Sequence, residues 1–394
     1  MAFSKLKDDV FAVGVVIWDK EYFDELIPLP EGTSYNSYLV IGSEKVALID
    51  SVDPEKKELF YANLAKSDIS KIDYIISNHA EQDHSGSIPA LLDTYPQAKV
   101  VTNQKCKDFL KDLLEIDDAK FLTIGDKDTL SLGNKTLEFH LTPWVHWPET
   151  MVTYLKEDKI LFSCDFFGSH YASSELFVSD EPKVFSGAKR YFSEIMMPFR
   201  PQVKKNVERV ETLDLKMIAP SHGQVYKNPK AIIEAYKEWI SDNVKKEVLI
   251  PYVSMHGSTL KMVNYLVDLL TEKGFIVKPF NLSTIDIGNY AISLIDASTI
   301  IVASPTVLAG PHPLAVYGTF LTNLLRPKTK FLTVVGSFGW GGKMIETLKD
   351  MVSNLKVELI EPVLIKGVPK KSDYQLLDKL VLDLDKKHQE LGIR

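Results

Sequence analysis

The chain has 394 residues, of which 45% are hydrophobic and 25% charged, a composition typical of soluble globular proteins and a length that favours two domains. Its net charge of −7 argues against nucleic-acid binding, which requires a basic surface, and no apolar run approaches the ~18 residues needed to cross a bilayer. The only two cysteines, Cys106 and Cys164, rule out a disulfide scaffold, so we expect a reducing compartment, the cytoplasm.

The first part of the chain, residues 1–245, is expected to form one domain of short strands and helices. Apolar runs on either side of a Gly-Ser turn predict a hairpin at residues 38–41 and 46–50. Asp53 and Pro54 then predict a helix start, because aspartate caps a helix and proline suits its first position. Strands and helices intermix here without a regular βαβ rhythm, which indicates layered sheets with helices outside.

The second part, residues 246–394, alternates regularly between strand and helix. Five apolar strands separated by helices predict a doubly wound parallel sheet. Pro251 conflicts with this pattern, because proline is disfavoured in a central strand; we expect the strand to end early or to contain a bulge. The expected strands are 247–253, 275–280, 299–303, 330–335 and 357–364, and the expected helices are 258–272, 314–325, 342–353 and 373–389, with 286–296 as a further candidate.

Four potential metal ligands lie within six residues, directly after a strand-like segment. They are His79, Glu81, Asp83 and His84, and the first three alternate so that an extended backbone would direct them to one side. Three further candidates, which each follow a strand-like segment, are His146, Asp165 and His222. Alone, each of these would more often be a hydrogen-bonded histidine or a strand-end cap. Together with the cluster they predict a dinuclear metal site, because unpaired buried carboxylates are costly.

Three loops of the second part follow the carboxyl ends of strands and suit a flavin. Hydroxyls and a glycine at a helix start make an anion cradle, and glycines in the other loops would admit a planar ring. Trp340 could stack on that ring or be an ordinary aromatic. For His256 and His312, contact with the flavin and the absence of contact are equally expected. The candidate residues are Ser254, Met255, His256, Gly257, Ser258, Thr259, Ser304, Pro305, Thr306, Gly336, Ser337, Phe338, Gly339, Trp340 and Gly341. The three loops resemble the FMN site of flavodoxins, which implies phosphate binding by the first loop and isoalloxazine contact by the others.

The metal motifs resemble those of the metallo-β-lactamase fold, which also has an aspartate at the position of Asp50. Many hydrolases of that superfamily have histidine where this chain has Glu81; glutamate there, followed by a doubly wound domain, resembles the flavodiiron proteins (A-type flavoproteins). The resemblance implies a metallo-β-lactamase-like αββα sandwich over 1–245 and a flavodoxin-like domain over 246–394.

Carried over by position, the resemblance implies two non-haem irons. His79, Glu81 and His146 would bind one iron, Asp83 and His222 would bind the other, and Asp165 would bridge them. His84 ligates in some relatives and turns away in others. Imidazoles mixed with carboxylates independently suit non-haem iron better than zinc. Outside the ligand set, Asp50 is expected to support ligands rather than bind metal, and His170 to be either such a partner or a surface histidine.

The resemblance further implies an oxidoreductase that reduces dioxygen to water, nitric oxide to nitrous oxide, or both. Electrons would come from rubredoxin or a reduced deazaflavin and pass through FMN to the irons. The family arrangement implies a head-to-tail homodimer or a dimer of dimers, in which each FMN faces the partner's irons. The alternatives are a dizinc hydrolase with the same N-terminal fold, and a pure electron carrier whose metal site is vestigial.

Overall fold

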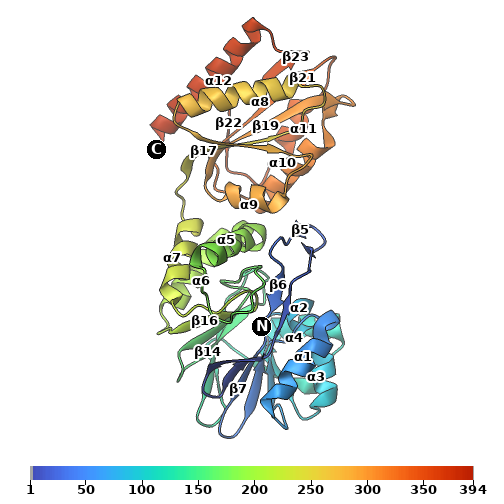
Figure 1. Ribbon diagram of the computed structural model, residues 1–394, viewed down its shortest axis with the longest axis vertical. Helices are drawn as coiled ribbons and strands as arrows, with labels where there is room; N and C mark the ends of the chain where they lie inside the picture. The colour runs from blue at the N-terminus through green and yellow to red at the C-terminus, as the bar shows by residue number, and fades with distance from the viewer. Residues whose placement is uncertain (1–2, 394) are drawn as a thin grey trace. The chain divides into compact units, whose positions relative to one another are not determined.

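The computed structural model describes residues 3–393, which separate into two compact units (Figure 1). The first comprises the chain up to Phe192 together with Phe199–Ile240; the second comprises the chain from Ser241 onward together with Ser193–Pro198. The separation after Ile240 lies close to the boundary expected after residue 245. No helix within residues 3–393 is long and apolar enough to span a membrane.

The first unit contains a seven-stranded sheet that is antiparallel at one side and parallel at the other. Strands β1, β2, β7 and β8 pair antiparallel, and β8, β9, β10 and β11 pair parallel. The predicted hairpin is present as β7 and β8. In sheet order the strands are β1 (Ser4–Lys7), β2 (Val10–Ala12), β7 (Tyr38–Ile41), β8 (Val46–Ile49), β9 (Tyr74–Ile76), β10 (Lys99–Asn103) and β11 (Phe121–Ile124).

A second, five-stranded sheet completes the sandwich. It is antiparallel from β12 to β15. Strand β16, which follows β15 in the chain after several helices, pairs with β15 in parallel. In order the strands are β12 (Thr129–Ser131), β13 (Thr136–Leu141), β14 (Met151–Leu155), β15 (Ile160–Cys164) and β16 (Met217–Pro220). Two small antiparallel pairs lie outside these sheets: β3 (Val15–Ile17) with β6 (Thr33–Tyr35), and β4 (Tyr22–Phe23) with β5 (Ile27–Pro28).

Side-chain alternation along the strands produces two apolar layers. Ile75 of β9 packs in a cluster with Phe60 and Leu110 from the helices, whereas Ile76 packs in a cluster with Phe139 and Phe162 of the second sheet. Successive residues of a strand face opposite sides, so one strand supplies both layers. The first unit is therefore a sandwich of two sheets with helices outside, and the predicted metallo-β-lactamase-like fold is confirmed.

The first helical turn of the first unit begins where its capping residue predicts. Asp53 accepts a hydrogen bond from the Glu55 backbone N–H and starts a 3-10 turn that continues into α1. Helix α7 contacts both α5 and α6, and the three helices lie near β16 (Figure 1). The helices are η1 (Pro54–Lys56), α1 (Lys57–Leu64), η2 (Ala65–Ser67), α2 (Gln82–Ser85), α3 (Ile88–Thr94), α4 (Gln104–Leu114), η3 (Asp118–Lys120), α5 (Glu181–Tyr191), α6 (Arg200–Glu211) and α7 (Pro229–Ile240). Between α5 and α6, the π-helical turn η4 (Phe192–Met196) and the turn η5 (Met197–Phe199) contain the segment Ser193–Pro198 that belongs to the second unit.

The second unit is built on the predicted doubly wound parallel sheet. Its main strands follow the order β18-β17-β19-β21-β22, which is the flavodoxin-like order. The strands are β17 (Lys245–Tyr252), β18 (Ile276–Asn281), β19 (Ala297–Val307), β20 (Gly310–Pro311), β21 (Phe331–Phe338), β22 (Glu358–Leu359) and β23 (Val363–Lys366). The helices are α8 (Ser258–Glu272), α9 (Ile287–Leu294), α10 (Pro313–Leu325), α11 (Met344–Asp350) and α12 (Lys371–Glu390).

Two prolines affect this sheet differently from expectation. Strand β17 continues through Pro251, which pairs with Phe280, and its irregular step lies earlier, between Lys245 and Val248. The expectation that Pro251 ends the strand or forms a bulge was therefore wrong. The last predicted strand, in contrast, is divided into β22 and β23 by residues 360–362. Pro362 in that gap lacks a backbone N–H and cannot donate to β21.

His388 is a fully buried histidine that secures the C-terminal helix α12 to the sheet. Its Nδ1 donates to the Leu384 carbonyl at 2.7 Å, so the neutral ring presents Nε2 as an acceptor to the Ser298 and Thr299 hydroxyls, 2.8 and 3.1 Å away. Burial lowers the pKa of His388, and the nearby positive charge of Lys246 lowers it further. The folded unit therefore contains the uncharged form.

Acidification is expected to loosen α12. Because the pKa of His388 is depressed in the folded state, its contribution to stability is complete above the unfolded value of about 6.5 and is lost as the pH falls toward the folded value. Hydrogen exchange of the α12 amides should accelerate between about pH 7.5 and pH 5.5, after correction for intrinsic exchange. His388→Gln should remove this dependence, and an unchanged profile in that variant would contradict the assignment.

Candidate metal centre and flavin pocket

The seven candidate metal ligands lie on loops or helix starts that follow strands of the two sheets. His79 and Glu81 follow β9, and Asp83 and His84 lie in the short helix α2. His146 lies in the loop after β13, Asp165 directly follows β15, and His222 follows β16. The strands are rigid and their ends point toward one edge of the sandwich, so four separated stretches of sequence deliver their side chains to one volume.

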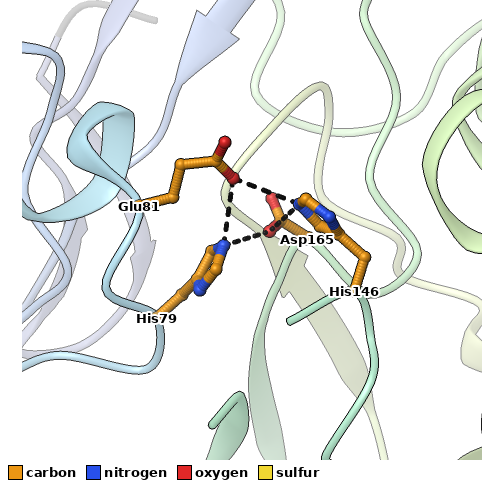
Figure 2. Close-up of side chains that lie close together, drawn as sticks. All are labelled: His79, Glu81, His146 and Asp165. Carbon is orange, nitrogen blue, oxygen red and sulfur yellow. Dashed lines mark hydrogen bonds and ion pairs between the residues drawn. The ribbon is translucent and has the colours of Figure 1, made fainter. Parts of the chain in front are cut away.

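Four of these residues form a first group, which we call the His79 group. Figure 2 shows His79, Glu81, His146 and Asp165 pointing toward one another. Glu81 Oε2 lies 3.1 Å from His79 Nε2 and 3.1 Å from His146 Nε2. Asp165 Oδ2 lies 3.5 and 3.6 Å from the same two nitrogens. The potential ligand atoms all lie within 4.8 Å of one another, close enough to surround one ion.

Asp83, His84 and His222 form a second group, the His222 group, which also meets Asp165. Asp83 Oδ1 lies 3.2 Å from His84 Nε2, and Asp83 Oδ2 lies 3.3 Å from His222 Nε2. Asp165 Oδ1 lies 3.0 Å from His84 Nε2 and 3.2 Å from His222 Nε2. Asp165 thus presents one oxygen to each group, and His84 turns toward the second group rather than away.

The buried polar atoms of the second group fit a cation. Both carboxylate oxygens of Asp83 and the Nε2 atoms of His84 and His222 are buried without a hydrogen-bond partner, as is Asp165 Oδ2. Their neighbours lie at ion-pair distance but not in hydrogen-bonding orientation. Buried polar atoms without partners are rare in folded proteins and call for a specific explanation. Four imidazoles and three carboxylates around two adjacent volumes suit a pair of non-haem irons.

Opposite charges shift the pKa values across the cluster. Burial alone would raise the pKa of Asp165, but the adjacent imidazoles of His84 and His222 hold it well below its ordinary value. Burial alone would lower the pKa of His222, but the adjacent carboxylates of Asp165 and Asp83 raise it to about 10. In the metal-free protein the cluster therefore binds protons at positions that a cation can take over.

Several residues hold the ligands without belonging to the predicted set. Glu149 Oε1 lies 2.6 Å from His79 Nδ1, the Ser34 carbonyl accepts from His222 Nδ1 at 2.8 Å, and the Tyr191 hydroxyl donates to Asp165 Oδ1 at 2.7 Å. Sequence analysis missed all three. Glu149 lies three residues after His146, but no local pattern connects Tyr191 or Ser34 to the ligands.

Asp50 and His170 lie beside the cluster. Asp50 accepts hydrogen bonds from the backbone and side-chain nitrogens of Asn78, so it fixes the end of β9 instead of pointing into either group. His170 is buried rather than on the surface: its Nδ1 contacts Thr33 Oγ1 at 2.9 Å and its ring lies 5.2 Å from the ring of His222.

The second unit has a cleft at the carboxyl ends of β17, β19 and β21. Gly257, with a φ of +84°, lets the chain turn into α8, and the helix start exposes free backbone N–H groups. Thr259 Oγ1 and Ser337 Oγ lie 3.2 Å apart at this point. The residues lining the cleft are Ser254, Met255, His256, Ser258, Thr259, Pro305, Thr306, Ser337, Phe338, Gly339 and Gly367.

The remaining flavin candidates do not line the cleft. Ser304 is buried, and its hydroxyl accepts from the His312 backbone N–H, while His312 itself caps α10 by accepting from Leu314. Gly336 lies within β21, where a side chain would collide with Met344 and the Ser304 carbonyl. Trp340 is 68% exposed, and neither it, Gly341 nor the turn residue Gly257 contributes to the lining. Gly367, after β23, was missed because its segment contains no motif beyond a single glycine.

Comparisons with known proteins extend this picture. Residues 33–223 match the model of the "ODP family beta lactamase" family. The chain is 36% identical to a nitric oxide reductase of Moorella thermoacetica, across 94% of this chain and 95% of that protein. Rubredoxin oxygen:oxidoreductase from Desulfovibrio gigas superposes with a TM-score of 0.95 at 29% identity, covering 98% of this chain and 99% of the other. The flavodiiron protein of Giardia intestinalis superposes with a TM-score of 0.88 at 28% identity, covering 98% and 96%.

Proposed function

The chain belongs to the flavodiiron protein family, and on that premise we propose that it reduces dioxygen to water, nitric oxide to nitrous oxide, or both, with electrons passing through FMN to two irons. The observation that carries the proposal is Asp165, which presents one oxygen to each of two adjacent groups of potential ligands. A single carboxylate between two cation positions is the arrangement that a dinuclear centre requires.

In this proposal His79, Glu81 and His146 hold one iron, and Asp83 and His222 hold the other. Asp165 would contribute one oxygen to each iron, and His84 would be a further ligand of the second iron because its Nε2 faces both Asp83 and Asp165. When bound, the iron pair would pass electrons to the gas, two from the irons themselves and, for dioxygen, two more from the reduced flavin. A dizinc hydrolase is less well supported, since Glu81 adds an oxygen donor and a hydrolase has no use for a flavin unit.

A cavity of about 260 Å³ reaches the ligands Glu81 and Asp83 and provides a route for gas and protons. Lys20, Asp24 and Asp53 also line it. Reduction of either gas consumes protons as well as electrons. Partial burial raises the pKa of Asp24, and in the metal-free protein the charges of Glu81 and Asp83 raise it further.

The cleft of the second unit is proposed to hold FMN. The start of α8 would bind the phosphate through free N–H groups and the hydroxyls of Ser258 and Thr259, and the β19 and β21 ends would contact the isoalloxazine. Bound FMN supplies one- and two-electron transfer between a donor and the irons. The proposed donor is a rubredoxin or a reduced deazaflavin. Both cysteines are free thiols, which supports a reducing compartment such as the cytoplasm.

A head-to-tail homodimer, or a dimer of such dimers, is proposed as the functional assembly. Exposed apolar side chains lie near the flavin cleft and would be covered by a second copy: Leu308 is 92% exposed, and Met255 and Trp340 are 51% and 68% exposed. Sedimentation of the FMN-loaded protein tests this assembly, and a monomer at the concentration where it is active would contradict it.

The proposed function is tested by measuring the metal and flavin content of the protein and the rate at which it reacts with each gas. Protein purified without added metal should contain two irons and one FMN per chain. After anaerobic reduction, stopped-flow mixing with dioxygen or nitric oxide should reoxidise the flavin within the instrument's range and produce water or nitrous oxide without released peroxide. An active preparation that contains zinc and no flavin would support the hydrolase instead, and a flavin protein that reduces neither gas would support the electron carrier.

A further inference from the structure

His79 is held from two sides by chemically different partners. Its Nε2 points into the His79 group, toward Glu81 and Asp165. Its Nδ1 points the other way and meets Glu149 Oε1 at 2.6 Å, a distance typical of a charge-assisted hydrogen bond. Neither side chain is exposed to solvent at all. The ring is therefore fixed with its proton on Nδ1 and its lone pair on the metal side whenever Nε2 binds a cation.

Glu149 is itself held rigidly. The same Oε1 accepts from the Ala80 backbone N–H at 3.1 Å, and the Glu149 backbone carbonyl accepts from Asn103 Nδ2 at 2.6 Å. The second carboxylate oxygen, Oε2, is buried and has no hydrogen-bond partner. A buried carboxylate in this condition is costly unless positive charge lies nearby. A cation behind His79 would provide that charge.

The partner behind His222, in the second group, is of a different kind. His222 Nδ1 donates to the neutral carbonyl of Ser34 at 2.8 Å. Asp50, another buried carboxylate beside the cluster, accepts from Asn78 and lies near the Ser221 hydroxyl. A carboxylate behind a ligating histidine raises the basicity of the ring more than a carbonyl does. His79 is therefore supported by a carboxylate and His222 by a neutral carbonyl.

We propose that Glu149 is a positioning residue that makes the His79 group the tighter of the two metal positions, so that this position fills first and empties last. The inference rests on the proposed function, since it assumes that both groups bind metal. Glu149 touches neither metal nor substrate; it acts through the orientation and basicity of His79.

Stepwise loading of the full-length, metal-free protein with Co²⁺ tests this inference. Competition with a coloured chelator gives the two affinities, and the cobalt absorption spectrum reports the ligand environment of each step. The wild-type protein should bind the first equivalent more tightly than the second. Glu149→Gln keeps an acceptor for His79 and Ala80 but removes the charge, and should weaken the first step by about 10-fold; Glu149→Ala should weaken it by up to about 100-fold. Glu149→Asp keeps the charge and should fall between wild type and Glu149→Gln.

Glu247→Gln is the matched control, because Glu247 is a buried glutamate of the second unit that pairs with Lys278 and lies outside both ligand groups, and it should leave the first step unchanged. If Glu149→Ala fails to fold, the glutamine and aspartate variants still decide the question. Equal affinities for the two wild-type equivalents, or a wild-type first step in Glu149→Gln, would overturn the inference. Failure of the wild-type protein to bind two equivalents would instead count against the proposed function.

Discussion

Replacing Asp165 with alanine is expected to empty both metal positions while leaving the flavin in place. Asp165 supplies Oδ2 to the His79 group and Oδ1 to the His222 group, so one substitution removes a ligand from each. Loss of a residue that merely supports a ligand lowers metal affinity or activity by roughly 10- to 100-fold. Loss of the shared ligand should therefore lower gas consumption by more than about 100-fold. Iron analysis, flavin absorbance and oxygen or nitric oxide electrodes measure the three quantities.

The control for this experiment is Asp214→Ala. Asp214 is an exposed carboxylate that pairs with Lys159 on the surface, and exposed ion pairs contribute little to stability. That variant should keep its iron, its FMN and its activity. Wild-type iron content together with wild-type gas consumption in Asp165→Ala would show that the two groups of ligands are not joined through Asp165.

Replacing Ser258 with aspartate is expected to yield a stable protein that no longer binds FMN. Ser258 is the first residue of α8 and lines the cleft. A carboxylate at a helix N-terminus is favourable by about 0.3–1 kcal/mol, so the helix should not unfold. The same carboxylate would occupy the cradle proposed for the phosphate. Two like charges about 4 Å apart repel by about 4 kcal/mol at an effective dielectric constant near 20, so FMN affinity should fall by at least about 100-fold.

Ser258→Ala separates the charge from the loss of the hydroxyl. One hydrogen bond contributes about 1 kcal/mol, so this variant should bind FMN less than about 10-fold more weakly than the wild type. Both variants should retain two irons, because the His79 and His222 groups belong entirely to the first unit. Fluorescence titration of the flavin-free protein gives the affinities. Wild-type FMN binding by Ser258→Asp would exclude the start of α8 as the phosphate position.

The sequence predicts the second unit well because its strands are buried on both faces and therefore read as continuous apolar runs. The errors occur at prolines. Pro251 does not interrupt β17, which continues to Tyr252 with its bulge-like step nearer the start, whereas Pro362 lies where β22 and β23 separate. Whether a proline interrupts a strand depends on whether its missing N–H would have donated to a neighbouring strand. A single sequence does not show which strands pair or in which register.

The sequence by itself predicted which side chains would gather in a metal site and in which kind of unit they lie. His79, Glu81, Asp83 and His84 lie within six residues, and His146, Asp165 and His222 are marked by the strands that precede them. The expected extended backbone through the first three was wrong, because α2 begins at Gln82 and directs Asp83 to the His222 group. Only the tertiary structure decided that Asp165 faces both groups, that His84 turns inward, and that Glu149 lies behind His79 across 70 residues of sequence. Those relations depend on how two sheets pack face to face, and the packing is set by buried side chains throughout the unit rather than by any local motif.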